Sequence, residues 1–287
     1  MNADQPWTIR RLLEWTRDYL AGKGIESARL EAELLLAHAL RCAKIALYTR
    51  YDEVPDEAQR AAFRELVQRR VKGHPVAYLL GKKEFFSLEF EVNPAVLIPR
   101  PDSEWLVSEV KQGVKSLASP RLLDVGTGSG CLAIALAVNL KTAQVTAIDR
   151  SEEALAVARR NAQKHQVSQR LRFLLGDLFA PVAGERFDGI VSNPPYIRTG
   201  DLGGLAREVR DFEPHLALDG GPDGFAVIDR LLSEAGEYLA PGGSLWMEIG
   251  FDQAEETQRR AAAAGWTLAK ATRDAGNHVR VLCLHRP

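Results

Sequence analysis

The four residues Asn193-Pro194-Pro195-Tyr196 have the types and the order needed to hold a planar –NH2 group. They follow the apolar run 187–192, which predicts a buried strand, so Asn193 should lie at a strand's carboxyl end, where open α/β sheets bind ligands. The two prolines lack N–H donors and restrict φ, which stiffens the loop and leaves carbonyl oxygens free. A side-chain amide oxygen beside a free carbonyl offers two acceptors to the two hydrogens of an –NH2 group. The motif predicts a site for an amide or an exocyclic amine; a proline-rich turn with a capping Asn is the structural alternative.

A glycine-rich turn, residues 124–130, follows a second apolar strand and leads into a helical pattern. Its glycines allow close approach to the backbone at a helix N-terminus. The spacing is Gly-x-Gly-x-Gly rather than that of dinucleotide folds, and the absence of a following Gly-Lys-Ser/Thr disfavours a P-loop. Asp149 and Asp177 end the next two predicted strands. Each acid alone is typical of a turn or a cap, but their succession at strand ends indicates an adenosine-type ligand with free ribose hydroxyls.

Together, the turn 124–130, Asp149 and the motif at 193–196 resemble the class I S-adenosylmethionine-dependent methyltransferases. The Asn-Pro-Pro-Tyr form is typical of members that methylate nitrogen in planar amides or amines. Two further blocks, Pro-Arg-Pro-Asp-Ser-Glu at 99–104 and Phe-Glu-Pro at 212–214, resemble the bacterial release factor glutamine methyltransferases. This similarity runs from about residue 31 to the C-terminus.

The resemblance implies S-adenosylmethionine as cofactor and a set of residues that bind it. The expected cofactor-binding residues are Asp124, Gly126, Thr127, Gly128, Ser129, Gly130, Asp149, Asp177, Leu178 and Asn193. The expected substrate-binding residues are Asn193, Pro194, Pro195 and Tyr196. Leu178 stands where a larger residue such as Trp occurs in other members, which should alter packing against adenine.

Three residues of the Asn-Pro-Pro-Tyr motif, Asn193, Pro194 and Tyr196, are the expected catalytic residues. The oxygen of Asn193 and the carbonyl of Pro194 would accept the two amide hydrogens and stabilise the positive charge that grows on nitrogen. Tyr196 would pack its ring against the amide plane and close the pocket. We expect Arg100 to meet the methionine carboxylate or to cap the site as part of a lid; a surface Arg that pairs with Glu104 is the structural alternative. Glu213 and Pro214 are expected to support the Asn193 loop.

The resemblance also implies a protein substrate. The family methylates the side-chain N5 of the glutamine in the Gly-Gly-Gln motif of class 1 peptide chain release factors, which belongs to translation termination. The N-terminal helices would recognise the body of the release factor, since a three-residue loop offers too little surface for a specific interface. Three alternatives remain open: glutamine methylation of a ribosomal protein, adenine-N6 methylation of nucleic acid, and a non-catalytic module that binds the cofactor or a partner.

Length and charge agree with an enzyme of one large and one small domain rather than with a protein that binds nucleic acid non-specifically. The 287 residues contain 37 Lys plus Arg and 38 Asp plus Glu, a net charge of −1, so the chain lacks the positive excess that non-specific duplex binding requires. Its three cysteines form no Cys-x-x-Cys pair, and we expect no bound metal. The lack of a basic-then-apolar start or a long apolar run predicts a cytoplasmic protein that does not enter membranes. We also expect a monomer without a stable nucleic-acid partner.

Periodicity predicts an α/β protein in three parts. Residues 1–75 should form a small helical substrate-recognition domain, with Asp56 capping one of its helices. Residues 76–98 alternate in a way that predicts a β-hairpin linker. Residues 99–287 should form the Rossmann-like catalytic domain of a class I methyltransferase, with a mostly parallel sheet and helices on both faces.

Overall fold

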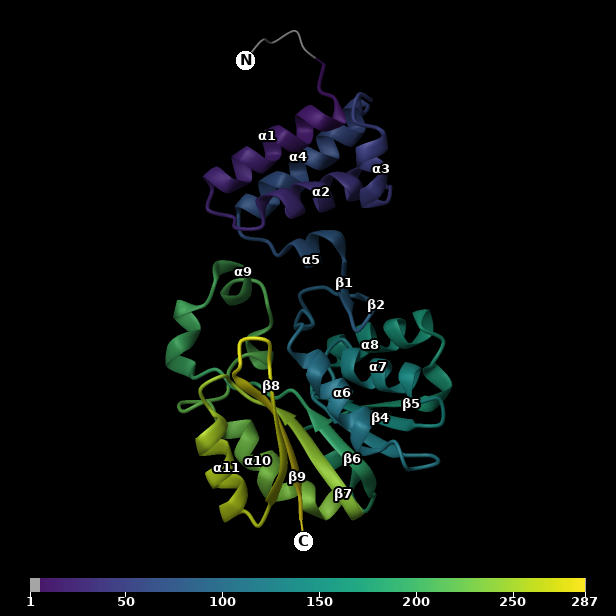
Figure 1. Ribbon diagram of the computed structural model, residues 1–287, viewed down its shortest axis with the longest axis vertical. Helices are drawn as coiled ribbons and strands as arrows, with labels where there is room; N and C mark the ends of the chain where they lie inside the picture. Colours follow the sequence, from purple (N-terminus) through teal and green to yellow (C-terminus); the bar gives the residue numbers. More distant parts are fainter. Residues whose placement is uncertain (1–5, 287) are drawn as a thin grey trace. The chain divides into compact units, whose positions relative to one another are not determined.

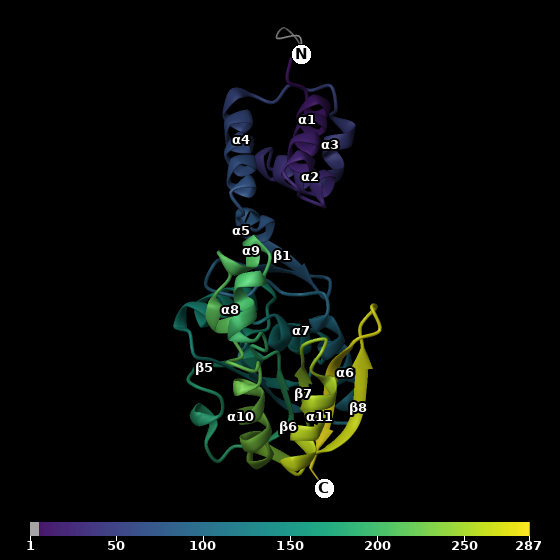
Figure 2. The same cartoon turned by 90° about the vertical axis from the view of Figure 1, so that its left-hand side faces the viewer.

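The computed structural model describes residues 6–286, and the chain divides into two compact units. The first unit spans Met1–Gly81 and includes the separate segment Arg207–Phe212. The second unit spans Lys82–Ala206 and Glu213–Pro287. The first is helical, and the second is built around a large β-sheet (Figures 1 and 2).

The first unit packs short helices around an aliphatic core that includes Leu20, Leu35 and Leu36. The helices are α1 (Ile9–Gly22), α2 (Ala28–Ala39), α3 (Lys44–Thr49), α4 (Glu57–Val71), α5 (Val76–Leu80) and α9 (Arg207–Arg210). Asp56 caps α4 as predicted: its carboxylate accepts from the backbone N–H of Gln59 at 2.8 Å, and the Gln59 side chain accepts from the Asp56 N–H at 3.0 Å.

The contacts between the segment Arg207–Phe212 and the rest of the first unit include an ion pair and a ring contact. Arg70, largely buried, pairs with Glu208 at 2.8 Å and with Glu31 at 2.6 Å. The rings of His74 and Phe212 lie 4.3 Å apart between centroids. The helical unit is therefore completed by residues far away in the sequence.

The expected hairpin is present but shorter than residues 76–98. Strand β1 (Lys82–Phe85) pairs antiparallel with β2 (Leu88–Glu91), and the two turn residues between them both have positive φ. Val76–Leu80, which we expected to belong to the hairpin, forms helix α5 instead. Pro75 precedes this helix, and Gly81 ends it. Gly81 has a φ of 69°, the left-handed conformation in which a glycine commonly ends a helix.

Seven strands form the main sheet of the second unit, in the order β5-β4-β3-β6-β7-β9-β8. They are β3 (Arg121–Val125), β4 (Gln144–Asp149), β5 (Leu171–Leu175), β6 (Phe187–Ser192), β7 (Leu239–Glu248), β8 (Thr267–Arg273) and β9 (Val279–His285). The first five in spatial order run parallel, and β9 is antiparallel to both of its neighbours. The α/β class with a mostly parallel sheet is confirmed.

Helices cover both faces of this sheet (Figure 1). On one face lie α6 (Ser103–Gly113), α7 (Cys131–Asn139) and α8 (Glu152–Lys164). On the other face lie α10 (Ala226–Glu234) and α11 (Ala254–Ala263). Because both faces are covered, the central strands β3, β4 and β6 are buried along almost their whole length rather than at alternate residues.

The order of the strands reverses beside β3. The sheet extends from β3 through β4 and β5 in one direction and through β6 and β7 in the other. Open α/β sheets bind ligands in the crevice outside the carboxyl ends of the strands at such a switch point. Val125 at the end of β3 is paired with Ser192 at the end of β6, so the glycine turn and the Asn193 loop emerge side by side.

Candidate active site

A cavity of about 350 Å³ lies at the carboxyl ends of β3, β4 and β6, a size suited to a small-molecule ligand. The predicted site residues that line it are Gly126, Gly128, Asp149, Asp177, Leu178, Asn193 and Pro195. The predicted residues outside its lining are Asp124, Thr127, Ser129, Gly130, Pro194 and Tyr196. The structure thus brings the glycine turn, both strand-end acids and the Asn193 loop to one cavity.

The glycine turn depends on backbone conformations that favour glycine. Gly126, Gly128 and Gly130 have φ of 76°, 55° and 80°. A Cβ at Gly126 or Gly128 would meet no atom within 4 Å in the protein, although both residues line the cavity. At Gly130 a Cβ would come within 2.9 Å of Ile134 Cδ1. The first two glycines therefore leave room for a ligand, and the third allows close helix packing.

Asp124 is completely buried beneath this turn. Its Oδ2 accepts hydrogen bonds from Thr127 Oγ1 at 2.7 Å and from the Ala133 N–H at 3.2 Å. Its Oδ1 has no hydrogen-bond partner within residues 6–286. Burial raises the pKa of the Asp124 carboxyl to about 7, against the effect of these two hydrogen bonds. Asp124 organises the turn and retains one buried acceptor for a cationic or donor group.

Asp149 ends β4 and anchors the turn from the neighbouring strand. Its Oδ2 accepts from the Gly128 N–H at 2.8 Å, and its Oδ1 accepts from the Ser151 N–H at 3.0 Å. Burial is the largest influence on this group and raises its pKa. Each carboxylate oxygen has a second lone pair, so the group retains capacity for two ligand hydroxyls.

Asp177 and Leu178 border the cavity on the side of β5. Asp177 is half-exposed and pairs with Arg230, which also lines the cavity, at 2.9 Å. Leu178 has a φ of 47°, yet its side chain is buried in the core beside Phe179. A non-glycine residue in this conformation is rare. Because its side chain is held in the core and also lines the cavity, Leu178 provides an apolar wall of the cavity.

The Asn193 loop presents two free acceptors. Its start is fixed because Ser192 Oγ donates to the Val125 carbonyl at 2.8 Å, which ties the ends of β6 and β3 together. The side chain of Asn193 donates from Nδ2 to Ser103 Oγ at 3.0 Å. Among the described residues, no donor reaches Asn193 Oδ1 or the carbonyl oxygen of Pro194. These two oxygens are the pair that the sequence predicted for binding an –NH2 group.

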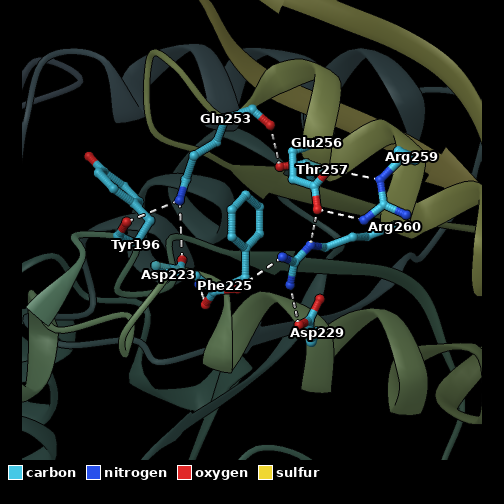
Figure 3. Close-up of polar contacts among 10 residues, drawn as sticks. Tyr196, Asp223, Phe225, Asp229, Gln253, Glu256, Thr257, Arg259 and Arg260 are labelled. Carbon is cyan, nitrogen blue, oxygen red and sulfur yellow. Dashed lines mark hydrogen bonds and ion pairs between the residues drawn. The ribbon is translucent and has the colours of Figure 1, made fainter.

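Gln253 holds the far end of the same loop (Figure 3). This buried residue donates from Nε2 to the Tyr196 carbonyl at 3.1 Å and to the Gly224 carbonyl at 3.2 Å. Its Oε1 accepts from the Gly250 N–H at 2.8 Å. Three loops are therefore joined through one amide side chain, and the position of Tyr196 depends on it.

Tyr196 directs its hydroxyl toward charged groups outside the cavity lining. Arg280 donates from Nη2 to the hydroxyl at 3.2 Å, and Glu248 Oε1 lies 3.5 Å away. Burial raises the pKa of the Tyr196 hydroxyl. The stacking of its ring on a substrate amide stays a prediction.

Arg100 and Glu213 pair with each other, which corrects two expectations. Arg100 Nη2 lies 2.5 Å from Glu213 Oε1, so its carboxylate partner is not Glu104. The buried Glu213 also accepts from the Ile98 N–H at 3.0 Å, and it therefore fixes residues 98–100 rather than the Asn193 loop. Glu104 instead accepts from the Phe86 N–H at 2.8 Å and secures the hairpin turn.

Sequence reasoning missed four residues that support the site: Ser103, Glu248, Gln253 and Arg280. Ser103 lies inside the Pro-Arg-Pro-Asp-Ser-Glu block, which was the available signal. The other three are separated from the Asn193 loop by more than fifty residues and carry no motif.

Within residues 6–286, no helix is long and apolar enough to span a membrane.

Two family models match the chain: "PrmC N-terminal domain" over residues 11–81 and "Methyltransferase small domain" over residues 101–208. A release factor glutamine methyltransferase from Rhodopirellula baltica is 45% identical, covering 99% of this chain and 98% of its own length. Another from Geobacter sulfurreducens is 49% identical, covering 87% and 86%. A solved methyltransferase structure from Pyrococcus furiosus shares the fold, with a TM-score of 0.51, 22% identity, and coverage of 76% of this chain and 95% of that one.

Proposed function

The chain belongs to the release factor glutamine methyltransferase family, and we propose that it methylates the side-chain N5 of the glutamine in the Gly-Gly-Gln motif of class 1 peptide chain release factors. S-adenosylmethionine is the methyl donor. The observation that carries the substrate proposal is the pair of free acceptors, Asn193 Oδ1 and the Pro194 carbonyl, in the loop whose residues Asn193 and Pro195 line the cofactor cavity. Two fixed acceptors match the two hydrogens of a glutamine amide.

The residues around the cavity fit the cofactor. The unpaired, buried Oδ1 of Asp124 suits the ammonium of the methionine moiety, and the spare lone pairs of Asp149 suit the two ribose hydroxyls. Open space over Gly126 and Gly128 lets the backbone approach the methionine moiety closely. Asp177 and Leu178 would border the adenine. When bound, S-adenosylmethionine supplies a methyl group on a positively charged sulfur.

The protein's own contribution to the reaction is orientation and charge stabilisation. An amide nitrogen is a poor nucleophile because its lone pair is delocalised into the carbonyl. Asn193 and Pro194 would hold both amide hydrogens, so that the nitrogen points at the methyl group at reacting distance. The same two oxygens stabilise the positive charge that develops on nitrogen, and this charge is lost when one of the two amide protons leaves to water. Tyr196 would close the pocket over the amide plane.

Asp124 makes cofactor binding depend on pH. Only its ionised form attracts the ammonium, so affinity should fall as the pH drops through about 7, approaching about tenfold per pH unit. Asp124→Asn keeps an oxygen for Thr127 and Ala133 but replaces the charged acceptor, and it should bind weakly at every pH. Isothermal titration calorimetry across a pH series would test this. A wild-type affinity that is flat through the titration of Asp124 would contradict the assignment.

We propose the following organisation and setting for the protein. Residues 1–75 recognise the body of the release factor, residues 76–98 connect the parts, and residues 99–287 perform the transfer. A substrate-recognition surface outside the catalytic site is required because a tripeptide loop provides too little contact area. The enzyme works in the cytoplasm as a monomer, and the net charge of −1 supports a protein rather than a nucleic-acid partner.

The decisive experiment measures methyl transfer from labelled S-adenosylmethionine to purified release factor. Wild-type factor should be labelled, and a factor whose Gly-Gly-Gln glutamine is replaced by alanine should not be. Label on ribosomal protein or RNA, with none on the release factor, would keep the chemistry and overturn the substrate. No transfer to any of these, with cofactor still bound, would indicate a non-catalytic binding module.

A further inference from the structure

We propose that Ser103 and Glu248 are positioning residues that fix which end of the Asn193 amide faces the substrate. The inference rests on the proposed function, because it assigns a role within the same methyl-transfer site. Ser103 Oγ donates to Glu248 Oε2 at 2.6 Å, and Asn193 Nδ2 donates to Ser103 Oγ at 3.0 Å. We call this series the Glu248–Ser103–Asn193 relay.

The fold places the three residues together from three separate elements. Glu248 ends β7, the neighbour of β6, and the pairing of Ser192 with Met247 brings Glu248 alongside Asn193. Ser103 is the first residue of α6. Glu248 is 0% exposed and Ser103 is 3% exposed, so water does not compete for their hydrogen bonds.

The relay has a direction that follows from the chemistry of its groups. An ionised carboxylate only accepts hydrogen bonds, so Ser103 must give its single hydroxyl hydrogen to Glu248. The oxygen of Ser103 is then left as an acceptor toward Asn193. It receives the –NH2 end of the amide, and Oδ1 is held at the opposite end, free of protein donors. A substrate –NH2 group needs an acceptor, so this orientation is the productive one.

The surroundings of Glu248 have opposing effects on its ionisation: burial disfavours the ionised carboxylate, whereas a nearby arginine and the Ser103 hydrogen bond favour it. Arg280 Nη2 lies 3.7 Å from Glu248 Oε1, and Arg280 Nε lies 3.5 Å from Asp102 and 3.9 Å from Asp274. Burial raises the pKa of the Glu248 carboxyl, whereas the Ser103 hydrogen bond and the Arg280 charge act against that rise. The Tyr196 hydroxyl completes the environment at 3.5 Å.

A carboxylate at this position is costly for stability. Removing a charge from water is unfavourable unless it is well paired, and the contact with Arg280 is loose. A neutral or apolar residue of similar size would satisfy packing alone. The ability to fix the direction of the Ser103 hydroxyl is what distinguishes a carboxylate from those alternatives.

Glu248→Gln is the first test because it should reverse the direction of the hydrogen bonds in the relay while the shape of the side chain hardly changes. Arg280 and Tyr196 should retain the oxygen of the new amide, which leaves its –NH2 group to donate to Ser103. Ser103 would then donate to Asn193 Oδ1, and the Asn193 amide would turn its –NH2 end toward the substrate. We expect kcat for release factor to fall on the order of tenfold or more, with cofactor affinity and the KM for release factor nearly unchanged.

Substitutions at Ser103 separate positioning from packing. Ser103→Ala should lower kcat in the same way, and Ser103→Thr, which keeps the hydroxyl, should recover most of it. Ser108→Ala is the matched control, because this exposed serine of the same helix only donates to the Glu104 carbonyl and should leave kcat unchanged. The wild-type kcat at saturating cofactor should also fall as the pH drops through the titration of Glu248, since a protonated Glu248 reverses the same bonds.

A spectroscopic readout tests the relay independently of methylation. The side-chain –NH2 resonances of Asn193, assigned by their loss in Asn193→Asp, should show one hydrogen-bonded proton that exchanges more slowly in wild type than in Ser103→Ala. Wild-type kcat in Glu248→Gln, or equal losses of kcat and of cofactor affinity in the Glu248 and Ser103 variants, would overturn the proposal. If wild-type enzyme labels no release factor, the proposed function fails, and the Asn193 resonances still decide whether the relay exists.

Discussion

Asn193→Ala should lower kcat for release factor on the order of 10² or more, a much larger factor than any loss of affinity for the cofactor, which Asn193 is also expected to contact. The substitution removes one of the two acceptors that hold the glutamine amide and leaves the other, the Pro194 carbonyl, in place. A loss of this size corresponds to one preorganised hydrogen-bond acceptor that acts on charge developing in the transition state. Single-turnover transfer from labelled S-adenosylmethionine gives the rate of the chemical step, and calorimetry gives the cofactor affinity.

The control for Asn193→Ala is Gln163→Ala, which removes an exposed amide from α8 and should leave kcat unchanged. Thermal unfolding of both variants shows whether the fold is retained, since Asn193 contributes one partly buried hydrogen bond to stability. A kcat for Asn193→Ala within a few-fold of wild type would mean that the amide is oriented by other groups. An equal loss of cofactor affinity would place Asn193 in cofactor binding rather than in the transfer step.

The sheet and the position of the site were predictable because buried parallel strands carry strong local signals. The runs that became β3 and β6 are rich in buried apolar residues, and the glycine turn and Asn193 follow directly at their carboxyl ends. Once the strands are parallel, their carboxyl ends must share one edge. The sequence therefore located the crevice without any knowledge of tertiary contacts.

The features that sequence analysis did not predict, helix α5 and the ion pair of Arg100 with Glu213, cannot be recognised from a local sequence pattern. Helix α5 has only five residues, too few to show a helical period, and its apolar run reads equally well as a strand. Arg100 had a nearby acid in Glu104, but the fold brings the buried Glu213 closer. A partner more than a hundred residues away is selected by strand register and burial, which act only after the sheet has formed.

The same reason explains why Glu248 was not recognised as part of the site. It follows an apolar strand, where a single acid is typical of a strand end, and its partner Ser103 is 145 residues away. Only the pairing of β6 with β7 brings it beside Asn193. Motifs revealed the groups expected to touch ligands, whereas the groups that orient them became visible only with the tertiary structure.

We expect the position of the Asn193 loop to depend more on its contacts with Gly224 and Gln253 than on the stiffness of its two prolines. The substitution Gly224→Ala tests this. Gly224 has a φ of 82°, and a Cβ there would lie 2.6 Å from the Tyr196 carbonyl oxygen and 2.8 Å from Gln253 Nε2. The loop must shift to relieve these contacts. Because a displacement of about 1 Å costs up to about 10² in rate, we expect kcat to fall by about that factor.

Gly184→Ala separates this shift from backbone strain. Gly184 has a φ of 80°, nearly that of Gly224, but a Cβ there would meet no atom within 4 Å. Both variants should lose about 1 to 2 kcal/mol of stability from the left-handed conformation, measured by denaturant unfolding, and only Gly224→Ala should lose activity and additional stability. Equal kcat values in the two variants would show that the Asn193 loop keeps its catalytic geometry without support from Gln253 and Gly224. The prolines at 194 and 195, the bond from Ser192 to Val125 and the Glu248–Ser103–Asn193 relay would then be sufficient to hold the acceptors in place.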